Sequence, residues 1–236
     1  MTKGELTVDM MRTLALGFNQ NNSVTELFVQ GNLMKEGANA IFFETVWRDT
    51  TLKVLNFRYQ DIYRGELGIG PNEALRVIQA ITNMPNVTVL NLAGHYRIGF
   101  EGLTLIAREL PMLKLRELDL SFRIQREHPQ TEEQFSLARD TATQAILQGL
   151  RPNHSLFKLR VCSEIIDAND EFYFYTHRNF WRHFLVTTDD DIPLTIWCYI
   201  FERRQPDALC RVVTSLIYYI LSERPDLVRP YNLRIQ

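Results

Sequence analysis

Apolar residues recur along this chain in a fixed hexamer, with apolar positions at its first, fourth and sixth places. Five segments fit the pattern: VTELFV from Val24, LKVLNF from Leu52, VTVLNL from Val87, LRELDL from Leu115 and LFKLRV from Leu156. Their starts lie 28, 35, 28 and 41 residues apart, which indicates a basic repeat with two insertions. The alternation at the end of each hexamer is typical of a short strand with one buried face.

Each hexamer is followed by apolar residues at helical spacing. The pattern predicts helices over 37–46, 73–81, 102–110 and 131–150. Thr131 and Gln134 stand at capping-box spacing, which supports a helix start there. Asn21, Asn86 and Asn153 each occupy an N-x-S/T triplet in the turn before a strand, and we predict that they serve the turn rather than carry glycans.

A strand and a long helix in each repeat resemble the ribonuclease-inhibitor type of leucine-rich repeat, over roughly residues 8–163. The resemblance implies an α/β fold: a right-handed leucine-rich-repeat (LRR) solenoid with a parallel sheet on its concave side and helices on its convex side. That family usually places Asn or Cys at the ninth repeat position, where it satisfies backbone groups of the loop. Only Asn32 fits, whereas Gln60, His95, Arg123 and Glu164 stand at the other four positions. We therefore expect irregular loops after the strands.

The two ends depart from the repeats. Residues 1–163 form the repeat region, in which 8–18 read as the helix half of a unit without its strand. Either residues 1–20 cover this edge, or the sequence continues a longer array. Residues 164–236 are aromatic, with helices predicted at 170–186, 194–204 and 207–222, and resemble the tail of uncharacterised algal LRR proteins.

The tail is predicted to be an α-helical C-terminal cap, because an open solenoid end exposes a cross-section of core. A separate partner-binding module is the alternative. The residues expected to form one core against the last repeat are Phe180, Trp181, Phe184, Trp197, Phe201, Ile217 and Leu221.

Charge and composition narrow the function. With 26 Lys and Arg against 28 Asp and Glu, the net charge of −2 argues against a general binder of nucleic acid. No apolar run reaches the roughly 18 residues that cross a membrane, and the first ten residues lack the apolar core of a signal peptide. Three Cys form neither a metal quartet nor a disulfide framework. We expect a cytoplasmic protein, with the nucleus as the alternative, that does not bind membranes.

Catalytic motifs are weak. The five His include no pair at i, i+4, and the acidic run 189–191 lacks the spacing of a calcium loop. The segment GELGIG at 65–70 lacks the order of a nucleotide-binding loop. The sequence therefore predicts no enzyme, no metal, no cofactor and no small-molecule substrate.

The repeat geometry supplies a surface instead. Strand side chains alternate, so three rows are expected to face the concavity. They are Glu26, Val54, Val89, Glu117 and Lys158; Phe28, Asn56, Asn91, Asp119 and Arg160; and Gln30, Arg58, Ala93, Ser121 and Cys162. An ordinary solvated sheet is the alternative to a binding face.

The loops after the strands form a second candidate surface, because they stack along one rim. Its predicted members are Arg58, Arg64, Arg97, Arg123 and Arg126 with Tyr59, Tyr63, Tyr96 and Phe122. Arg and Tyr are enriched in binding hot spots. The alternative is that some of these aromatic side chains pack under the loops as local core.

The sequence thus favours a non-enzymatic scaffold or adaptor that binds another protein, with an acidic partner as one option. The predicted contact residues are Phe28, Arg58, Tyr59, Asn91, Tyr96, Arg97, Asp119, Arg123 and Arg160. A regulator of a small GTPase is the alternative, because the fold type also occurs in GTPase-activating proteins and a loop Arg can stabilise phosphoryl-transfer charge.

Overall fold

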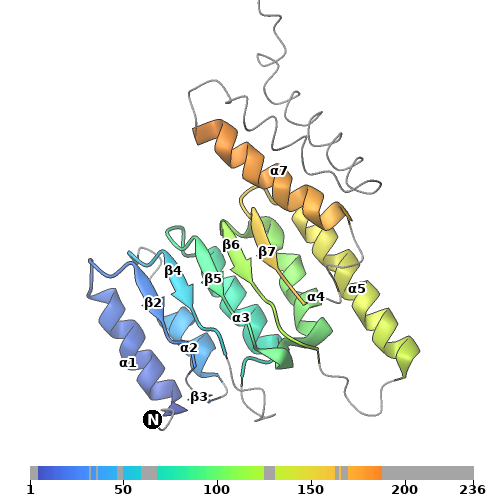
Figure 1. Ribbon diagram of the computed structural model, residues 1–236. Helices are drawn as coiled ribbons and strands as arrows, with labels where there is room; N and C mark the ends of the chain where they lie inside the picture. Colours follow the sequence, from blue (N-terminus) through green and yellow to red (C-terminus); the bar gives the residue numbers. More distant parts are fainter. Residues whose placement is uncertain are drawn as a thin grey trace, which may run out of the picture.

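The fold is an α/β arrangement built on one parallel sheet. The computed structural model describes residues 5–31, 33–35, 37–46, 50–59, 68–124, 131–162, 165 and 170–187. The sheet contains the strands β2 (Glu26–Phe28), β4 (Val54–Asn56), β5 (Val89–Asn91), β6 (Glu117–Asp119) and β7 (Lys158–Arg160), in chain order. Every pair is parallel (Figure 1), and the five predicted hexamers are therefore confirmed as strands.

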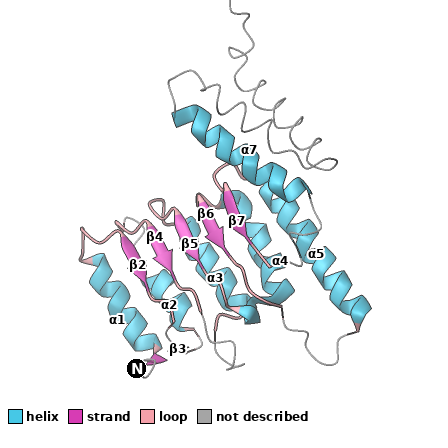
Figure 2. Cartoon of the chain, in the orientation of Figure 1, coloured by secondary structure: helices cyan, strands magenta, loops and turns pink. Residues whose placement is uncertain are grey.

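A layer of helices lies behind the sheet (Figure 2). It contains α1 (Val8–Asn19), α2 (Ala38–Thr45), α3 (Pro71–Thr82), α4 (Gly99–Glu109) and α5 (Glu132–Leu150). Each helix packs on the next in chain order, because every repeat adds one strand and one helix beside the previous pair. Short 3₁₀ turns, η1 (Tyr96–Ile98) and η2 (Leu110–Met112), flank α4. The four helices predicted between the strands are confirmed, with boundaries shifted by up to three residues.

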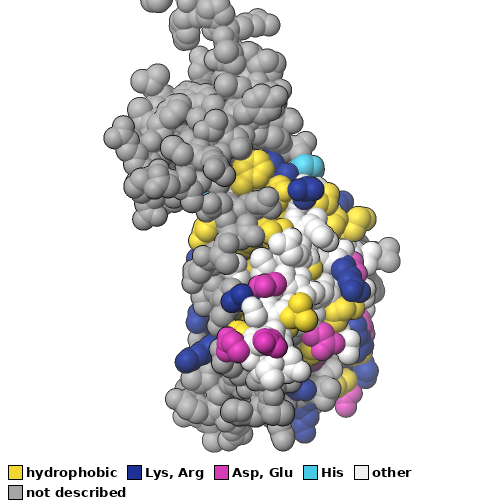
Figure 3. Space-filling model, turned by 90° about the vertical axis from the view of Figure 1, so that its right-hand side faces the viewer, with side chains coloured by type: hydrophobic (Ala, Val, Ile, Leu, Met, Phe, Trp, Pro, Cys, Tyr) yellow, Lys and Arg dark blue, Asp and Glu magenta, His cyan; other side chains and the backbone are white. Residues whose placement is uncertain are grey.

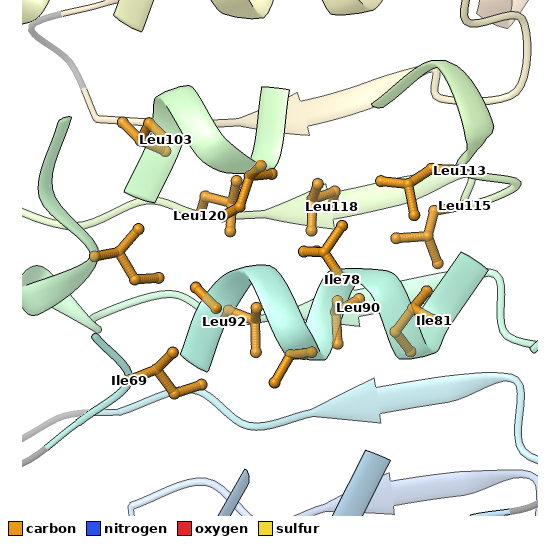
Figure 4. Close-up of a cluster of buried hydrophobic side chains, with 14 of the residues drawn as sticks. Ile69, Ile78, Ile81, Leu90, Leu92, Leu103, Leu113, Leu115, Leu118 and Leu120 are labelled. Atoms are coloured by element: carbon orange, nitrogen blue, oxygen red, sulfur yellow. The ribbon is translucent and has the colours of Figure 1, made fainter. Parts of the chain in front are cut away.

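The core lies between the two layers. The middle residue of each strand points toward the helices, and Leu55, Leu90 and Leu118 are paired in register and about 1% exposed or less. Figure 4 shows the same alternation continued, with Leu92 and Leu120 beside Leu90 and Leu118. Helices α3 and α4 close the core from the other side. Burying one such side chain contributes about 1.5–3 kcal/mol, so the repeated Leu positions supply much of the driving force.

At the N-terminal side, α1 covers α2. Met11 and Ala15 are fully buried, and the ring of Phe18 packs edge-on against Phe42 at 6.1 Å. A two-stranded parallel pair, β1 (Glu5–Leu6) with β3 (Leu33–Met34), joins this end, and the sequence did not predict it. Strands of two residues are too short to show alternation, so the hexamer pattern carries no signal for them.

Two of the three predicted turn residues, Asn21 and Asn153, bond the backbone of their own turns. The side-chain oxygen of Asn21 accepts the backbone N–H groups of Ser23 and Val24, and that of Asn153 accepts those of Ser155 and Leu156. This Asx geometry starts the following strand. Asn86 acts differently, since its amide donates to the Thr50 carbonyl of the preceding repeat.

Helix α5 begins with the predicted capping box. The Thr131 hydroxyl accepts the Gln134 N–H at 3.2 Å, and the Gln134 side chain accepts the Thr131 N–H at 3.0 Å. Helix α2 is capped from another repeat, because its N-cap residue, Gly37, has no side chain. The buried Glu73 carboxylate of α3 accepts the N–H groups of Asn39 and Ala40 at 3.2 and 3.3 Å. Burial outweighs these hydrogen bonds and raises the pKa of Glu73.

We predict that Glu73→Ala lowers the free energy of unfolding by about 1 kcal/mol, the usual effect of losing an N-cap. Because the pKa is raised by folding, the charged carboxylate is itself costly, and its contribution to stability falls as the pH rises through the folded pKa. Glu73→Gln keeps an acceptor without the charge, so it should be as stable as the wild type at pH 7. Urea denaturation of both variants checks this, and an unchanged Ala variant would contradict it.

Helix α7 (Asp170–Thr187) crosses the end of the sheet and packs on α5 and β7. Phe172 and Tyr175 are buried there, while Phe180 is 42% exposed and lies edge-on to Phe157 at 5.8 Å. The first predicted tail helix is thus confirmed. Of the remaining predicted tail core, the side chains of Trp181 and Phe184 and all of Trp197, Phe201, Ile217 and Leu221 lie outside the described residues.

Candidate functional site

The sheet face opposite the helices presents the outward side chains of the strands. The register puts Glu26, Val54, Val89, Glu117 and Lys158 in one row, and Phe28, Asn56, Asn91, Asp119 and Arg160 in the next, as the sequence predicted. We call these ten residues the open face. Each is half-buried or exposed, and Phe28 is 55% exposed. The third predicted row is wrong in part, since Ala93 and Cys162 are buried where the chain turns after each strand.

Two ion pairs join β6 to β7 across the open face. The Lys158 ammonium lies 2.5 Å from a Glu117 carboxylate oxygen, and the Arg160 guanidinium lies 3.4 Å from Asp119. Such partly exposed pairs stabilise a fold by about 1 kcal/mol at most. Their larger effect is on the charge of the open face, because the cation and the carboxylate of each pair neutralise each other.

The second row of the open face also shapes the loops. The side-chain oxygens of Asn56, Asn91 and Asp119 accept the backbone N–H two residues further on, at 3.1, 2.9 and 3.0 Å. The same turn therefore recurs at the carboxyl ends of β4, β5 and β6. One carboxylate oxygen of Asp119 and the side-chain amide oxygen of Asn91 each accept one of these hydrogen bonds. The bonds hold the orientation of both side chains, which the sequence predicted as partner contacts.

The predicted rim of Arg and aromatic residues is only partly exposed. Arg58 and Arg123 are exposed, and Tyr96 and Arg97 are half-buried. The expectation that Tyr59 and Phe122 lie on this edge is wrong, since they are 4% and 8% exposed. Tyr59 follows the core residue Phe57 by two positions, and Phe122 follows Leu120 by two positions. Because side chains of an extended chain alternate between its two faces, both continue the buried face beyond the strand. Tyr63, Arg64 and Arg126 lie outside the described residues.

Beneath the rim, His95 binds the loops together. Its Nδ1 accepts the Ile69 N–H at 3.1 Å, so Nε2 carries the proton and donates to the Phe57 carbonyl at 2.8 Å. Tyr59 stacks on the ring at 5.5 Å between centroids. His95 thus satisfies loop backbone groups from the ninth repeat position, a role the family resemblance implied for Asn or Cys. Burial is the main cause that lowers its pKa to about 4, against the opposing hydrogen bond to Phe57.

The neighbouring glycine makes this packing possible. Gly94 has φ +83°, and a Cβ there would lie 1.8 Å from the Tyr59 carbonyl oxygen. Only glycine allows the backbone of one repeat to approach the next this closely. The loop position is therefore fixed by Gly94 and His95 together.

Charges of both signs are interspersed on the surface. Figure 3, which views the side that lies at the right of Figure 1, shows acidic, basic and apolar side chains mixed on one face. A shallow groove between α4 and α5 is lined by Thr104, Arg108, Asp140, Gln144 and Gln148 among others.

Within the part of the chain that the structure describes, no three His, Cys, Asp or Glu side chains gather as metal ligands. None of the described helices combines the length and the apolar character needed to cross a bilayer. No protein-family model matches the chain, and no curated protein matches it either.

Proposed function

We propose that this chain is a non-enzymatic interaction protein of the leucine-rich-repeat type, which binds another protein through the open face. The observation that carries the proposal is the open face itself: ten strand side chains, held in register across five parallel strands, that no described helix covers. A curved solenoid gathers such side chains toward one partner. Repetition of the strand hexamer and of the Asx turn at 56, 91 and 119 supports the family assignment.

Of the nominated contacts, Phe28, Asn91, Asp119 and Arg160 belong to the open face. Arg58 and Arg123 border it, and Tyr96 and Arg97 contribute less area because they are half-buried. Tyr59 is removed from the set, because its side chain is buried under the loop. The binding surface is therefore the sheet with its adjacent Arg side chains rather than a continuous aromatic edge.

The test compares two neutral changes on the open face with two changes on the helix layer. Phe28→Ala with Val89→Gln removes apolar area without altering charge, and should weaken partner capture about tenfold, as expected when a contact worth about 1.4 kcal/mol is lost. Arg12 and Arg108 are exposed on α1 and α4, so Arg12→Glu with Arg108→Glu should leave capture unchanged.

Affinity capture from cells, quantified by mass spectrometry, provides the readout. Equal recovery of every partner by the open-face variant would overturn the proposal. A purified partner that is a small GTPase, and whose GTP hydrolysis is stimulated by the wild type but not by Arg58→Ala or Arg123→Ala, would establish the regulatory alternative.

A further inference from the structure

The open face carries an uneven distribution of charge once its ion pairs are taken into account. Lys158 and Arg160 are neutralised by Glu117 and Asp119. Four further cationic side chains, Lys53, Arg58, Arg116 and Arg123, are exposed at the two ends of β4 and β6. None of these four forms an ion pair within the described residues. The exposed carboxylate of Glu26 on β2 carries the opposite charge.

These four cations form two pairs. Lys53 and Arg116 precede β4 and β6 and are linked through Thr88 by the backbone ladder. Arg58 and Arg123 follow the carboxyl ends of the same two strands. Along β4, Lys53 and Arg58 are five residues apart, which corresponds to about 16 Å at a rise of about 3.3 Å per residue. On β6, Arg116 and Arg123 are seven residues apart. Lys53 and Arg116 are in register, and β4 and β6 are about 10 Å apart because one strand lies between them. At the carboxyl ends, Arg123 lies two residues beyond the position that is in register with Arg58.

Between the two pairs of cations, each outward side chain of β4 and β5 is either apolar or polar, and none is charged. Val54 and Val89 lie side by side in register and are half-buried, with Asn56 and Asn91 in the row beyond them. An occupant would bury the two Val side chains in the middle and place its own charges at either end.

We infer that the open face binds an acidic protein segment that runs along β4, in which two carboxylate clusters about 16 Å apart flank a short apolar stretch. The inference rests on the proposed function and adds the chemistry of the partner. Carboxylates at each end pair with Lys53 and Arg116 or with Arg58 and Arg123, and the apolar stretch covers Val54 and Val89. Arg binds carboxylates through two parallel hydrogen bonds, which gives the ends their specificity.

Nucleic acid is less well matched to this surface. Binding of single strands relies on aromatic side chains on which bases stack. The open face carries one aromatic side chain, Phe28 on β2, among its ten residues. None of the outward residues of β4, β5 or β6 is aromatic, and Tyr59 and Phe122 at their ends are buried.

The experiment uses the full-length chain and fluorescent peptides of the form Glu-Glu-X-X-X-Glu-Glu, where X is Val, Ile, Leu or Phe. Fluorescence polarisation measures the dissociation constant of each peptide. Two matched libraries serve as controls: one with Gln in place of every Glu, and one with the same composition but all four Glu adjacent. We expect binding by the spaced acidic peptides that is at least about tenfold tighter than by either control.

Two charge-reversal variants then test the ends separately. Lys53→Glu with Arg116→Glu, and Arg58→Glu with Arg123→Glu, should each weaken binding by about tenfold or more. The helix-layer variant Arg12→Glu with Arg108→Glu makes the same change in net charge and should have no effect. Circular dichroism confirms that all three variants are folded.

Several outcomes would overturn the inference. These are equal binding of the Gln library, equal binding of the adjacent-Glu library, no binding by any spaced peptide up to millimolar concentration, or unchanged affinity in both charge-reversal variants. Tighter binding of a single-stranded oligouridylate 12-mer, abolished by the same variants, would indicate nucleic acid instead. If Phe28→Ala with Val89→Gln abolishes partner capture while charge reversal does not, the proposed function stands and this inference fails.

Discussion

Replacing Arg178 by Met should detach α7 from the sheet and cost about 3 kcal/mol or more of unfolding free energy. Arg178 is 6% exposed, and its guanidinium donates to the carbonyl oxygens of Leu150, Arg151 and Asn153 at 3.3, 3.0 and 2.5 Å. The first two end α5, where helix carbonyls have no partner within the helix and the dipole favours a cation. Met fills similar volume but leaves these buried acceptors unsatisfied.

The neighbouring Asn179 strengthens the same joint. It is fully buried, and its amide donates to the Leu156 carbonyl at 2.9 Å, while its own oxygen accepts from Arg178. Asn153 links the repeat that contains β7 to the one before it, because its side-chain amide donates to the backbone carbonyl oxygens of Leu110 and Leu113. The chain of contacts from Leu110 through Asn153 to Arg178 therefore ties α7 to two successive repeats.

Hydrogen exchange and urea denaturation of the Arg178→Met variant provide the measurement. Because each unit of a repeat protein contacts only its neighbours, amide protection should fall in 170–187 and persist in β4 and β5. Arg178→Lys keeps the charge but loses the planar fork, so it should be intermediate. Arg108→Met, an exposed change on α4, is the matched control. Full protection of α7 in the Met variant would show that the carbonyl contacts are not what holds it.

The strand register could be predicted because a strand has a side-chain period of two, and a shift of one residue would expose every Leu. Leu55, Leu90 and Leu118 therefore fix the pairing from sequence alone, and the two outward rows follow from it. The capping box at Thr131 was predictable for a similar reason, since both partners lie three residues apart in one short segment.

The contacts that position the loops could not be predicted, because they join residues far apart in the chain. Glu73 caps a helix 34 residues earlier, and Arg178 bonds carbonyls some 25–28 residues earlier. Backbone carbonyls leave no trace in side-chain patterning, so nothing in the sequence marks Arg178 as buried. Tyr59 was misplaced because an aromatic residue near Arg side chains fits a binding edge and a local core equally well; only the stacking on His95 decides between them.

The burial of His95 also makes the fold sensitive to acid. Its pKa is lowered from 6.5 to about 4, so the folded protein keeps the ring neutral where the unfolded chain takes up a proton. The stabilising effect is complete above pH 6.5 and is lost as the pH falls toward 4. One pKa unit corresponds to about 1.4 kcal/mol, so the full loss is about 3 kcal/mol. Glu73, whose pKa is raised, changes stability in the opposite direction over part of this range.

A comparison of variants isolates the His95 contribution, because Glu73 is common to all of them. Urea denaturation between pH 7.5 and 5 should show the wild type losing about 2 kcal/mol more than His95→Asn, in which the amide can accept from Ile69 and donate to Phe57 without titrating. The control His154→Gln removes an exposed histidine and should keep the wild-type pH dependence. Parallel pH profiles for wild type and His95→Asn would mean that the ring is protonated within the fold, and that the loops open to accommodate the charge.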